Sequence, residues 1–254
     1  MDARFLVLSV SDEVATVTIN RPDKGNSLSP QVLEEIVLTF AELSTRDDVK
    51  VIVLTGGEKM FSAGFDLDYI RTIEKADNEE FTALFHLAYR SILFCDQPVI
   101  AAVGGPAIAG GFDLTLMCDI RYASERAKFG QREVVLSLNP LLDPLWRIIG
   151  LGPAKELALT GRIIDAEEAF RLGYVSKVFP TGALLEGVTE IACSMASCDR
   201  ATLVETKKLS INVLGQGLDA AMKTQEWLFR SFIGSDDNKA RIDSLLASLK
   251  KRSK

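Results

Sequence analysis

The chain has 254 residues, of which 47% are hydrophobic and 25% charged, and its formal net charge at pH 7 is −6. This composition is typical of a globular protein, and the length suffices for one large domain or a core with an appendage. The negative charge argues against a broad nucleic-acid-binding face. The apolar stretch FLVLSV near the start is too short for a signal peptide or a membrane span.

Apolar periodicity predicts alternating strands and helices over about the first 180 residues. The predicted elements, in chain order, are a strand at 13–20, a helix capped by Ser29 and starting at Pro30, a strand at 49–56, a short helix after the loop that ends near 67, a helix at 79–95, a strand at 98–105, a helix within 104–116, and a strand at 119–124. This β-α-β alternation implies right-handed crossovers in an α/β core.

The pattern becomes helical from about Pro180. Helices are expected at 183–198, 201–213, 216–232 and 236–250. The sequence therefore predicts a core over 1–180 and a helical C-terminal region over 181–254, which extends the core rather than forming an independent domain.

The four cysteines lie in apolar surroundings without the paired spacing of a metal site; they are Cys95, Cys118, Cys193 and Cys198. We expect reduced, buried thiols and hence a cytoplasmic protein. The single histidine, His86, lies in an amphipathic helix and is interpreted as a packing or surface residue. Ser-His-Asp, Cys-His and histidine-based metal sites therefore lack their base or ligand.

Two glycine-containing segments share one pattern, in which a buried strand is followed by small residues and then by a helix start. They are FSAGFDL at 61–67 and AIAGGFDL at 107–114. The second is not a phosphate loop, because Phe112 stands where the lysine is required. Glycine permits close approach of the backbone, and amides at a helix start have no partner within the helix. Two such loops at neighbouring strand ends predict an oxyanion hole.

The sequence resembles the crotonase (enoyl-CoA hydratase/isomerase) superfamily. The resemblance is carried by INRPDKGNSLSPQVLEEI, VIVLTGGEKMFSAGFDL, QPVIAAVGGPAIAGGFDLTLMCDIRYASERAKFGQREVVLSL and LTGRIIDAEEAFRLGYVSKVFP, and it covers about residues 5–180. It implies an α/β fold with a crotonase-like ββα spiral core and the acyl-CoA site over 1–180. It also implies that 181–254 form a helical trimerisation region that helps to cover the active site, in a homotrimer or a dimer of trimers.

The resemblance also implies site residues. The oxyanion-hole amides fall on Phe65 and Gly110, and the two acids of the family's hydratases fall on Asp113 and Glu133. Further positions match segments that bind the substrate or its coenzyme A moiety: Lys24, Asn26, Ala63, Gly64, Asp66, Leu67 and Gly111. No cofactor is expected beyond the coenzyme A that the substrate carries, and no metal, nucleic acid or membrane partner is expected.

The chain departs from the family pattern near the second loop and beyond it. Asp113 replaces the usual glutamate and is one methylene shorter, about 1.5 Å. Arg132 replaces the proline before the second acid. The segment SLNPLLDPLWRIIG at 137–150 lacks the family's glycine-rich stretch. It introduces Asp143, which is either a third candidate acid or a helix N-cap before Pro144.

Two enzymatic functions and one non-enzymatic function remain open from the sequence. An enoyl-CoA hydratase would use both acids to add water to a 2-enoyl-CoA, and a Δ3-Δ2-enoyl-CoA isomerase would need Glu133 alone. A protein that binds acyl-CoA without efficient chemistry is the third hypothesis, which the shortened Asp113 and the altered 137–150 segment motivate.

Overall fold

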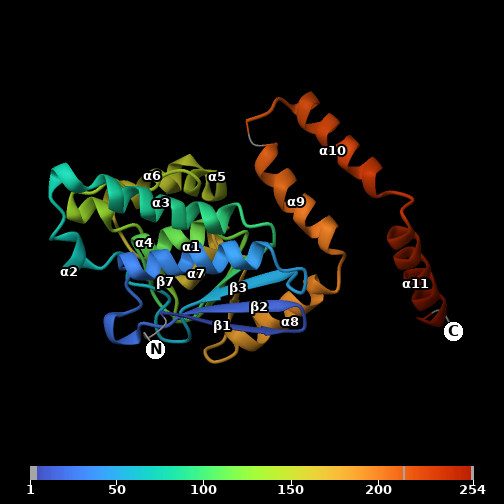
Figure 1. The fold of residues 1–254 in the computed structure, drawn as a ribbon, viewed down its shortest axis with the longest axis horizontal. Helices are drawn as coiled ribbons and strands as arrows, with labels where there is room; N and C mark the ends of the chain where they lie inside the picture. The colour runs from blue at the N-terminus through green and yellow to red at the C-terminus, as the bar shows by residue number, and fades with distance from the viewer. Residues whose placement is uncertain (1–4, 214, 253–254) are drawn as a thin grey trace. The chain divides into compact units, whose positions relative to one another are not determined.

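In the computed structural model of the protein, residues 5–213 and 215–252 are described, and the chain groups into two compact units, Met1–Ala196 and Ser197–Lys254. The first unit contains all strands of the described residues (Figure 1). Its α/β architecture confirms the fold class expected from the sequence.

A six-stranded sheet forms the centre of the first unit. Its strands, in spatial order, are β1 (Leu6–Ser11), β2 (Val14–Ile19), β3 (Val51–Thr55), β4 (Val99–Val103), β6 (Ile120–Ser124) and β9 (Lys177–Phe179). Only the β1–β2 pair is antiparallel; every other neighbouring pair is parallel. The sequence analysis predicted four of these strands and missed β1 and β9, which lie at the two edges.

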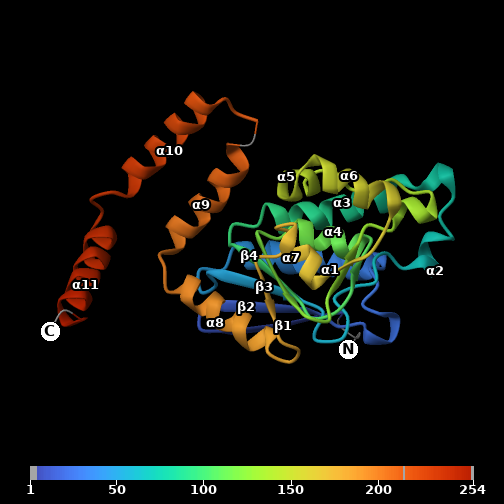
Figure 2. The same ribbon diagram turned by 180° about the vertical axis from the view of Figure 1, so that it is seen from behind.

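Helices cover both faces of this sheet, which is why its central strands are continuously apolar. Every residue of β3 and β4 is buried. The helix α1 (Pro30–Ser44) packs against α3 (Glu79–Leu93), and α8 (Leu184–Ala196) contacts β2, β3 and β4. Figure 2 shows α1 and α3 on one side of the sheet and α8 on the other.

The remaining helices of the first unit are short and lie between strands. They are the 3₁₀ helices η1 (Pro22–Lys24), η2 (Lys75–Asp77) and η3 (Glu133–Leu136), and the α-helices α2 (Leu67–Ile70), α4 (Gly110–Leu116), α5 (Leu145–Ile149), α6 (Leu151–Thr160) and α7 (Ala166–Arg171). Several of them begin where a strand ends. The glycine-containing loops occupy those junctions.

A second, three-stranded sheet brings together the segments that begin the helices α4 and η3. It consists of β5 (Ala107–Ile108), β7 (Lys128–Gly130) and β8 (Ile164–Asp165), and β5 pairs with β7 in parallel. The helix α4 follows β5 directly, and η3 follows β7 after a short loop. This pairing therefore brings the starts of α4 and η3 together.

The second unit consists of α9 (Arg200–Asn212), α10 (Leu218–Phe232) and α11 (Asp236–Arg252). The four C-terminal helices that the sequence predicts are thus present. The boundary, however, lies after Ala196 and not near residue 180, because α8 packs against the sheet and belongs to the first unit.

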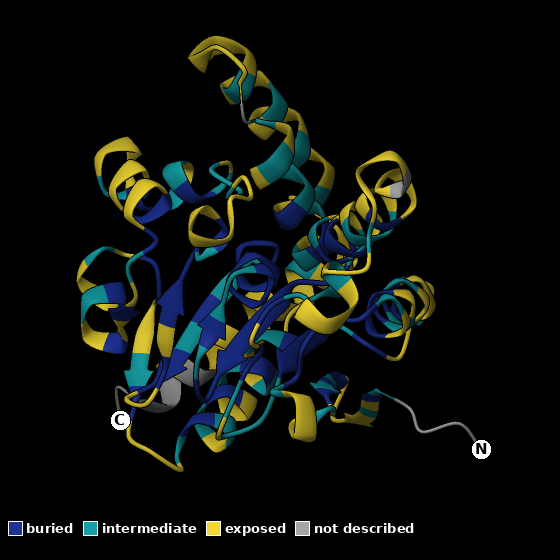
Figure 3. Cartoon of the chain, turned by 90° about the vertical axis from the view of Figure 1, so that its left-hand side faces the viewer, coloured by how far each residue is buried: buried dark blue, intermediate teal, exposed yellow. Residues whose placement is uncertain are grey.

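The central strands β3 and β4 are buried, whereas the edge strand β1 and many helix residues are exposed (Figure 3). The expectation of four buried thiols is confirmed for Cys95 and Cys118 but is wrong for Cys198, which is exposed; Cys193 is partly buried. Among the described residues, no helix has the length and hydropathy needed to cross a membrane.

Candidate active site

Asp113 is a buried acid in the first turn of α4. Its residue exposure is 5%, and Gln131 donates a hydrogen bond from Nε2 to Oδ1 over 3.3 Å. Burial raises the pKa of Asp113 well above its usual range, and the charge of Glu133 raises it further. Hydrogen bonds from Gln131 and Tyr89 oppose this shift of the pKa. The carboxyl group is thus buried, accepts a hydrogen bond from Gln131 and lies near the Tyr89 hydroxyl.

Glu133 is equally buried, at 5% exposure, and begins η3. In the described part of the chain neither of its carboxyl oxygens has a hydrogen-bond partner, and burial raises its pKa. A buried carboxyl group without a partner is costly, and such groups are uncommon in folded proteins. An atom in this situation is suited to contact a water molecule or a substrate.

Both acids face one cavity. A volume of about 540 Å³ is lined by Asp113 and Glu133 together with aromatic side chains of α3. Glu133 also lines a smaller cavity of about 210 Å³, whose walls include Phe65 and Ala109. The structure therefore brings the two sequence-predicted acids together and places Glu133 at the junction of the two spaces.

The two glycine-containing loops approach each other closely. Gly64 has a φ of +94°, and a Cβ atom at this position would lie 2.8 Å from the Ile108 carbonyl oxygen and 3.2 Å from the Gly110 nitrogen. Among the described residues, neither the Phe65 amide nor the Gly110 amide donates a hydrogen bond. Gly110 is the first residue of α4, where backbone amides have no acceptor within the helix.

Ala109 sets the direction of the second loop. Its φ of 49° and ψ of −127° are unusual for a residue with a side chain and carry strain. Its amide donates to the carbonyl oxygen of Gly130 over 2.8 Å, which holds the residue against β7. The backbone is thus held in a strained conformation immediately before Gly110.

Gly111 has a packing role in this structure. A Cβ atom at Gly111 would lie 2.4 Å from the carbonyl oxygen of Ser62, so that a side chain there would push the two loops apart. Ser62 and Ala107 also form an isolated parallel bridge between the loops.

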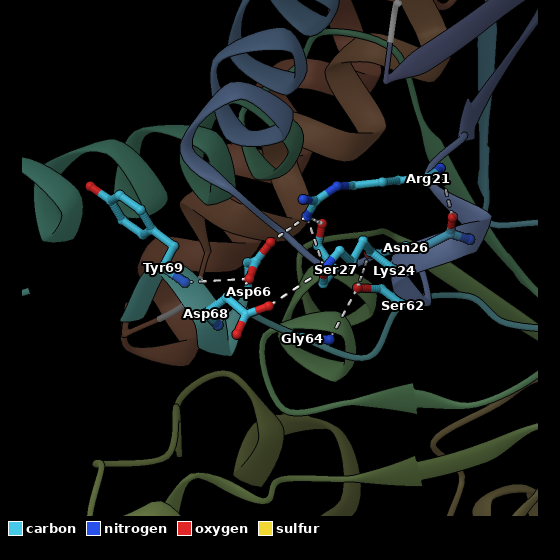
Figure 4. A network of polar contacts seen from close by, with 9 residues as sticks. All are labelled: Arg21, Lys24, Asn26, Ser27, Ser62, Gly64, Asp66, Asp68 and Tyr69. Carbon is cyan, nitrogen blue, oxygen red and sulfur yellow. Dashed lines mark hydrogen bonds and ion pairs between the residues drawn. The ribbon is translucent and has the colours of Figure 1, made fainter. Parts of the chain in front are cut away.

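A polar network fixes the first glycine loop to the turn around η1 (Figure 4). The side-chain amide of Asn26 donates to the carbonyl oxygens of Gly56 and Met60 at 3.0 and 2.9 Å, and its Oδ1 accepts from the amide of Arg21. Asn26 is buried and has a φ of 55°. Its polar atoms are therefore engaged within the protein, which assigns it to the framework of the loop.

Asp66 belongs to the same network. Arg21 donates from Nη1 to Oδ2 over 2.6 Å, and the carboxylate also accepts from the Asp68 amide as the N-cap of α2. Burial raises the pKa of Asp66, but these hydrogen bonds outweigh it, and the pKa lies below its usual range. Asp66 is an ionised structural anchor in this arrangement.

The other positions expected to bind the substrate lie at the surface or along the smaller cavity. Ala63 and Leu67 line that cavity. Lys24 is exposed and pairs with Asp68 over 3.4 Å. His86 is exposed as expected and stacks on Phe85 with ring centroids 4.4 Å apart, but it also lines the larger cavity.

Asp143 is separate from the two buried acids. Its carboxylate forms a paired contact with Arg147 at 2.7 and 2.9 Å, which lowers the pKa of Asp143, and it lines neither cavity. The N-cap of α5 is Pro144, so the expected capping role of Asp143 is wrong. The side chain instead binds the guanidinium group one helical turn further along the chain.

Two site residues were missed by the sequence analysis. Tyr89 is buried, lines the larger cavity, and its hydroxyl lies 3.4 Å from the carbonyl oxygen of Gly110. Gln131 donates to Asp113 and, over 2.6 Å, to the carbonyl oxygen of Leu141. Gln131 stands in the quoted FGQRE motif, whereas Tyr89 could have been found from its spacing of one helical turn after Phe85.

The similarity of this chain to known proteins covers all the residues of the candidate active site. The family model described as enoyl-CoA hydratase/isomerase matches residues 9–253. The chain is 35% identical to the short-chain-enoyl-CoA hydratase of Clostridium acetobutylicum, over 99% of this chain and 97% of that protein. It is 34% identical to the crotonyl-CoA hydratase of Syntrophomonas wolfei, over 97% and 95%.

Solved structures show the same similarity. The crystal structure of an enoyl-CoA hydratase from Bacillus anthracis matches with a TM-score of 0.91 and 32% identity, over 98% of this chain and 97% of that one. The match of a family model to nearly the whole chain, together with these full-length relatives, places the protein within the enoyl-CoA hydratase/isomerase family.

Proposed function

We propose that the protein is an enoyl-CoA hydratase, which adds water across the double bond of a 2-enoyl-CoA to form a 3-hydroxyacyl-CoA. The observation that carries the proposal is that Asp113 and Glu133, both buried, line one cavity, and that the amides of Phe65 and Gly110 have no acceptor among the described residues. Two carboxyl groups that flank one water molecule supply the base and the acid that hydration requires.

Asp113 is proposed to activate the water. Gln131 and Tyr89 direct hydrogen bonds at its carboxylate, and donors of this kind stabilise the ionised form. The carboxylate accepts a proton from the water as the water oxygen bonds to the β-carbon of the substrate. The electron pair of the double bond then moves toward the thioester, whose carbonyl oxygen gains negative charge.

Glu133 is proposed to protonate the α-carbon. It lines both cavities, and burial raises its pKa although its own backbone amide opposes this shift, which favours the protonated acid. Transfer of its proton to the α-carbon restores the thioester. The proton taken up by Asp113 balances the proton that Glu133 has lost, and exchange with solvent returns both groups to their initial states.

The amides of Phe65 and Gly110 are proposed to hold the thioester oxygen. An enolate forms on this oxygen during the reaction, and each donor of an oxyanion hole contributes about 3 kcal/mol to the stabilisation of such a transition state. The close approach of Gly64 to Gly110 supports this role, because it brings the two loops into contact. Ala63 and Leu67, on the smaller cavity, are proposed to contact the coenzyme A moiety.

The proposed reaction requires no cofactor beyond the coenzyme A of the substrate, since the two acids transfer both protons. We propose a cytoplasmic location. We also propose that the protein self-associates, as a trimer or a dimer of trimers, through the second unit. No residue of α10 is buried, and its exposed large side chains include Leu218, Met222, Trp227 and Phe229.

An isomerase is the second candidate function. The shortened Asp113 favours it, because transfer of a proton from the α-carbon to the γ-carbon needs only one carboxyl group, and no side chain of the described residues is hydrogen-bonded to the carboxyl group of Glu133.

The test follows the absorbance of the conjugated thioester in purified protein. Loss of absorbance with crotonyl-CoA supports hydration, and gain of absorbance with a 3-enoyl-CoA supports isomerisation. Saturable binding of both thioesters without conversion of either would contradict both proposals and favour a protein that only binds acyl-CoA.

A further inference from the structure

The larger cavity follows one face of α3. Side chains spaced three or four residues apart line it: Asn78, Phe81, Thr82, Phe85, His86 and Tyr89. This spacing places them in a row along the helix. From Asn78 to Tyr89 the helix rises about 16 Å, at about 1.5 Å per residue. The cavity is therefore elongated, with Tyr89 at one end of the row and Asn78 at the other.

The two ends of this row differ in chemistry. At the inner end, Tyr89 adjoins the buried Asp113 and Glu133. At the outer end, the lining residues Glu74, Lys75 and Asn78 are exposed. The cavity thus runs from the proposed reaction centre to the surface of the protein.

The wall between the two ends is mostly apolar, with the polar side chains of Thr82, His86 and Asn139 among its lining residues. Phe65 contacts Phe81 and Phe85 with ring centroids 5.3 and 5.1 Å apart. Ile70, Ile73 and Leu141 also line the cavity with apolar side chains. Removal of the methylene groups of an acyl tail from water by the apolar part of this wall would favour binding.

These dimensions exceed what a four-carbon acyl group fills. An extended carbon chain advances about 1.2 Å per bond, so a crotonyl group spans about 4 Å and a decenoyl group about 11 Å. We infer that the substrates of this enzyme are unbranched 2-enoyl-CoA thioesters of medium length, about eight to twelve carbons, whose tails lie along α3. This inference rests on the proposed hydratase function and names its substrate class.

The first experiment measures kcat/KM of the full-length protein for 2-enoyl-CoA thioesters of four, six, eight, ten and twelve carbons. Burial of one methylene is worth about a fourfold gain in binding. We expect kcat/KM for the ten-carbon substrate to exceed that for crotonyl-CoA at least tenfold. A kcat/KM that is highest for crotonyl-CoA and falls with length would overturn the inference.

A pair of variants tests the path of the acyl tail. Thr82 lines the cavity one turn from its outer end, and Thr82→Trp should fill that part. We expect the ratio of ten-carbon to four-carbon kcat/KM to fall at least tenfold. Ala83→Trp is the matched control, because Ala83 is exposed on the same helix outside the cavity lining, and it should leave the ratio unchanged. An unchanged ratio in Thr82→Trp would show that the tail lies elsewhere.

Binding separates this inference from the proposed activity. Titration calorimetry with saturated butyryl-CoA and decanoyl-CoA needs no turnover, and decanoyl-CoA should bind at least tenfold more tightly. Tighter decanoyl-CoA binding without hydration would support the cavity assignment and contradict the hydratase. Hydration of crotonyl-CoA with equal binding of the two thioesters would support the hydratase and overturn the assignment.

Discussion

Asp113 and Glu133 are buried to the same extent but differ in what surrounds their carboxyl groups. Asp113 accepts a hydrogen bond from Gln131, and the Tyr89 hydroxyl lowers its pKa, whereas neither carboxyl oxygen of Glu133 has a side-chain partner among the described residues. Burial raises both pKa values. Burial alone therefore does not distinguish an acid from a base here, and the pKa of Asp113 is raised further than that of Glu133. The proposed roles rest on the donors near Asp113 and on the position of Glu133 on both cavities.

The largest expected effect is at the acid without partners. Glu133→Gln removes the proposed proton donor, and kcat for hydration should fall about 1,000-fold, within the range typical of general acid–base catalysis. Steady-state kinetics with a 2-enoyl-CoA measure the change. Thermal unfolding provides the control: because the pKa of Glu133 is raised in the folded state, its ionisation destabilises that state as the pH rises above the ordinary range of a glutamate, so the variant should unfold at the same temperature or higher at pH 8. Retention of full activity would refute the assignment of Glu133.

Asp113→Asn should have the next largest effect and sharpens the contrast between the two acids. Hydration should fall about 100-fold, because the amide cannot accept a proton from the water. Isomerisation of a 3-enoyl-CoA, if the protein performs it, should change only a few-fold, since that reaction needs Glu133 alone. Equal losses in both reactions would contradict separate roles for the acids.

Tyr89→Phe should change the pH dependence more than the maximal rate. The hydroxyl of Tyr89 lowers the pKa of Asp113, so its removal should raise that pKa further. Because Asp113 is proposed to act in its ionised form, the acidic limb of the kcat profile should move to higher pH, with a loss of a few-fold near neutral pH. The measurement is kcat between pH 5 and 9.

Tyr174→Phe is the control for that experiment. Tyr174 is also buried, but its hydroxyl contacts Thr115 and it lies outside the lining of both cavities. Its loss should lower the unfolding temperature without moving the acidic limb. Equal shifts in both variants would attribute the effect to packing and not to the hydrogen bond at Asp113.

The smallest effect is expected at the third acid. Asp143→Asn breaks a solvent-accessible ion pair with Arg147, and such pairs contribute at most about 1 kcal/mol. kcat and KM should stay within about twofold of the unaltered protein. A tenfold loss of kcat would show that Asp143 takes part in the reaction and that the two buried acids are not sufficient.

The sequence predicted the parts of the molecule whose signals are local. The continuous apolar runs predicted β3 and β4, and the glycine-containing segments predicted the two adjoining loops. The pairing of Asp113 with Glu133 was expected from the family motif alone. The structure adds the physical reason, which is the pairing of β5 with β7.

Features that depend on distant contacts could not be predicted. The amphipathic pattern of α8 resembles that of the later helices, and only its packing on the sheet assigns it to the first unit. Asn26 and Asp66 matched positions for substrate binding, yet their hydrogen bonds to remote loops use their polar groups within the framework. Asp143 satisfied the local rules for an N-cap, but Arg147 offered a stronger, charged partner.

The conformation of Ala109 determines when the free-energy cost of orienting the Gly110 amide arises. Its strained backbone is held in the folded chain by the hydrogen bond to Gly130. If the Gly110 amide is the oxyanion donor proposed above, the energetic cost of aligning it falls once, when the protein folds, instead of in each turnover. A substitution that relieved the backbone strain at Ala109 would then raise the stability of the folded protein and lower its turnover rate.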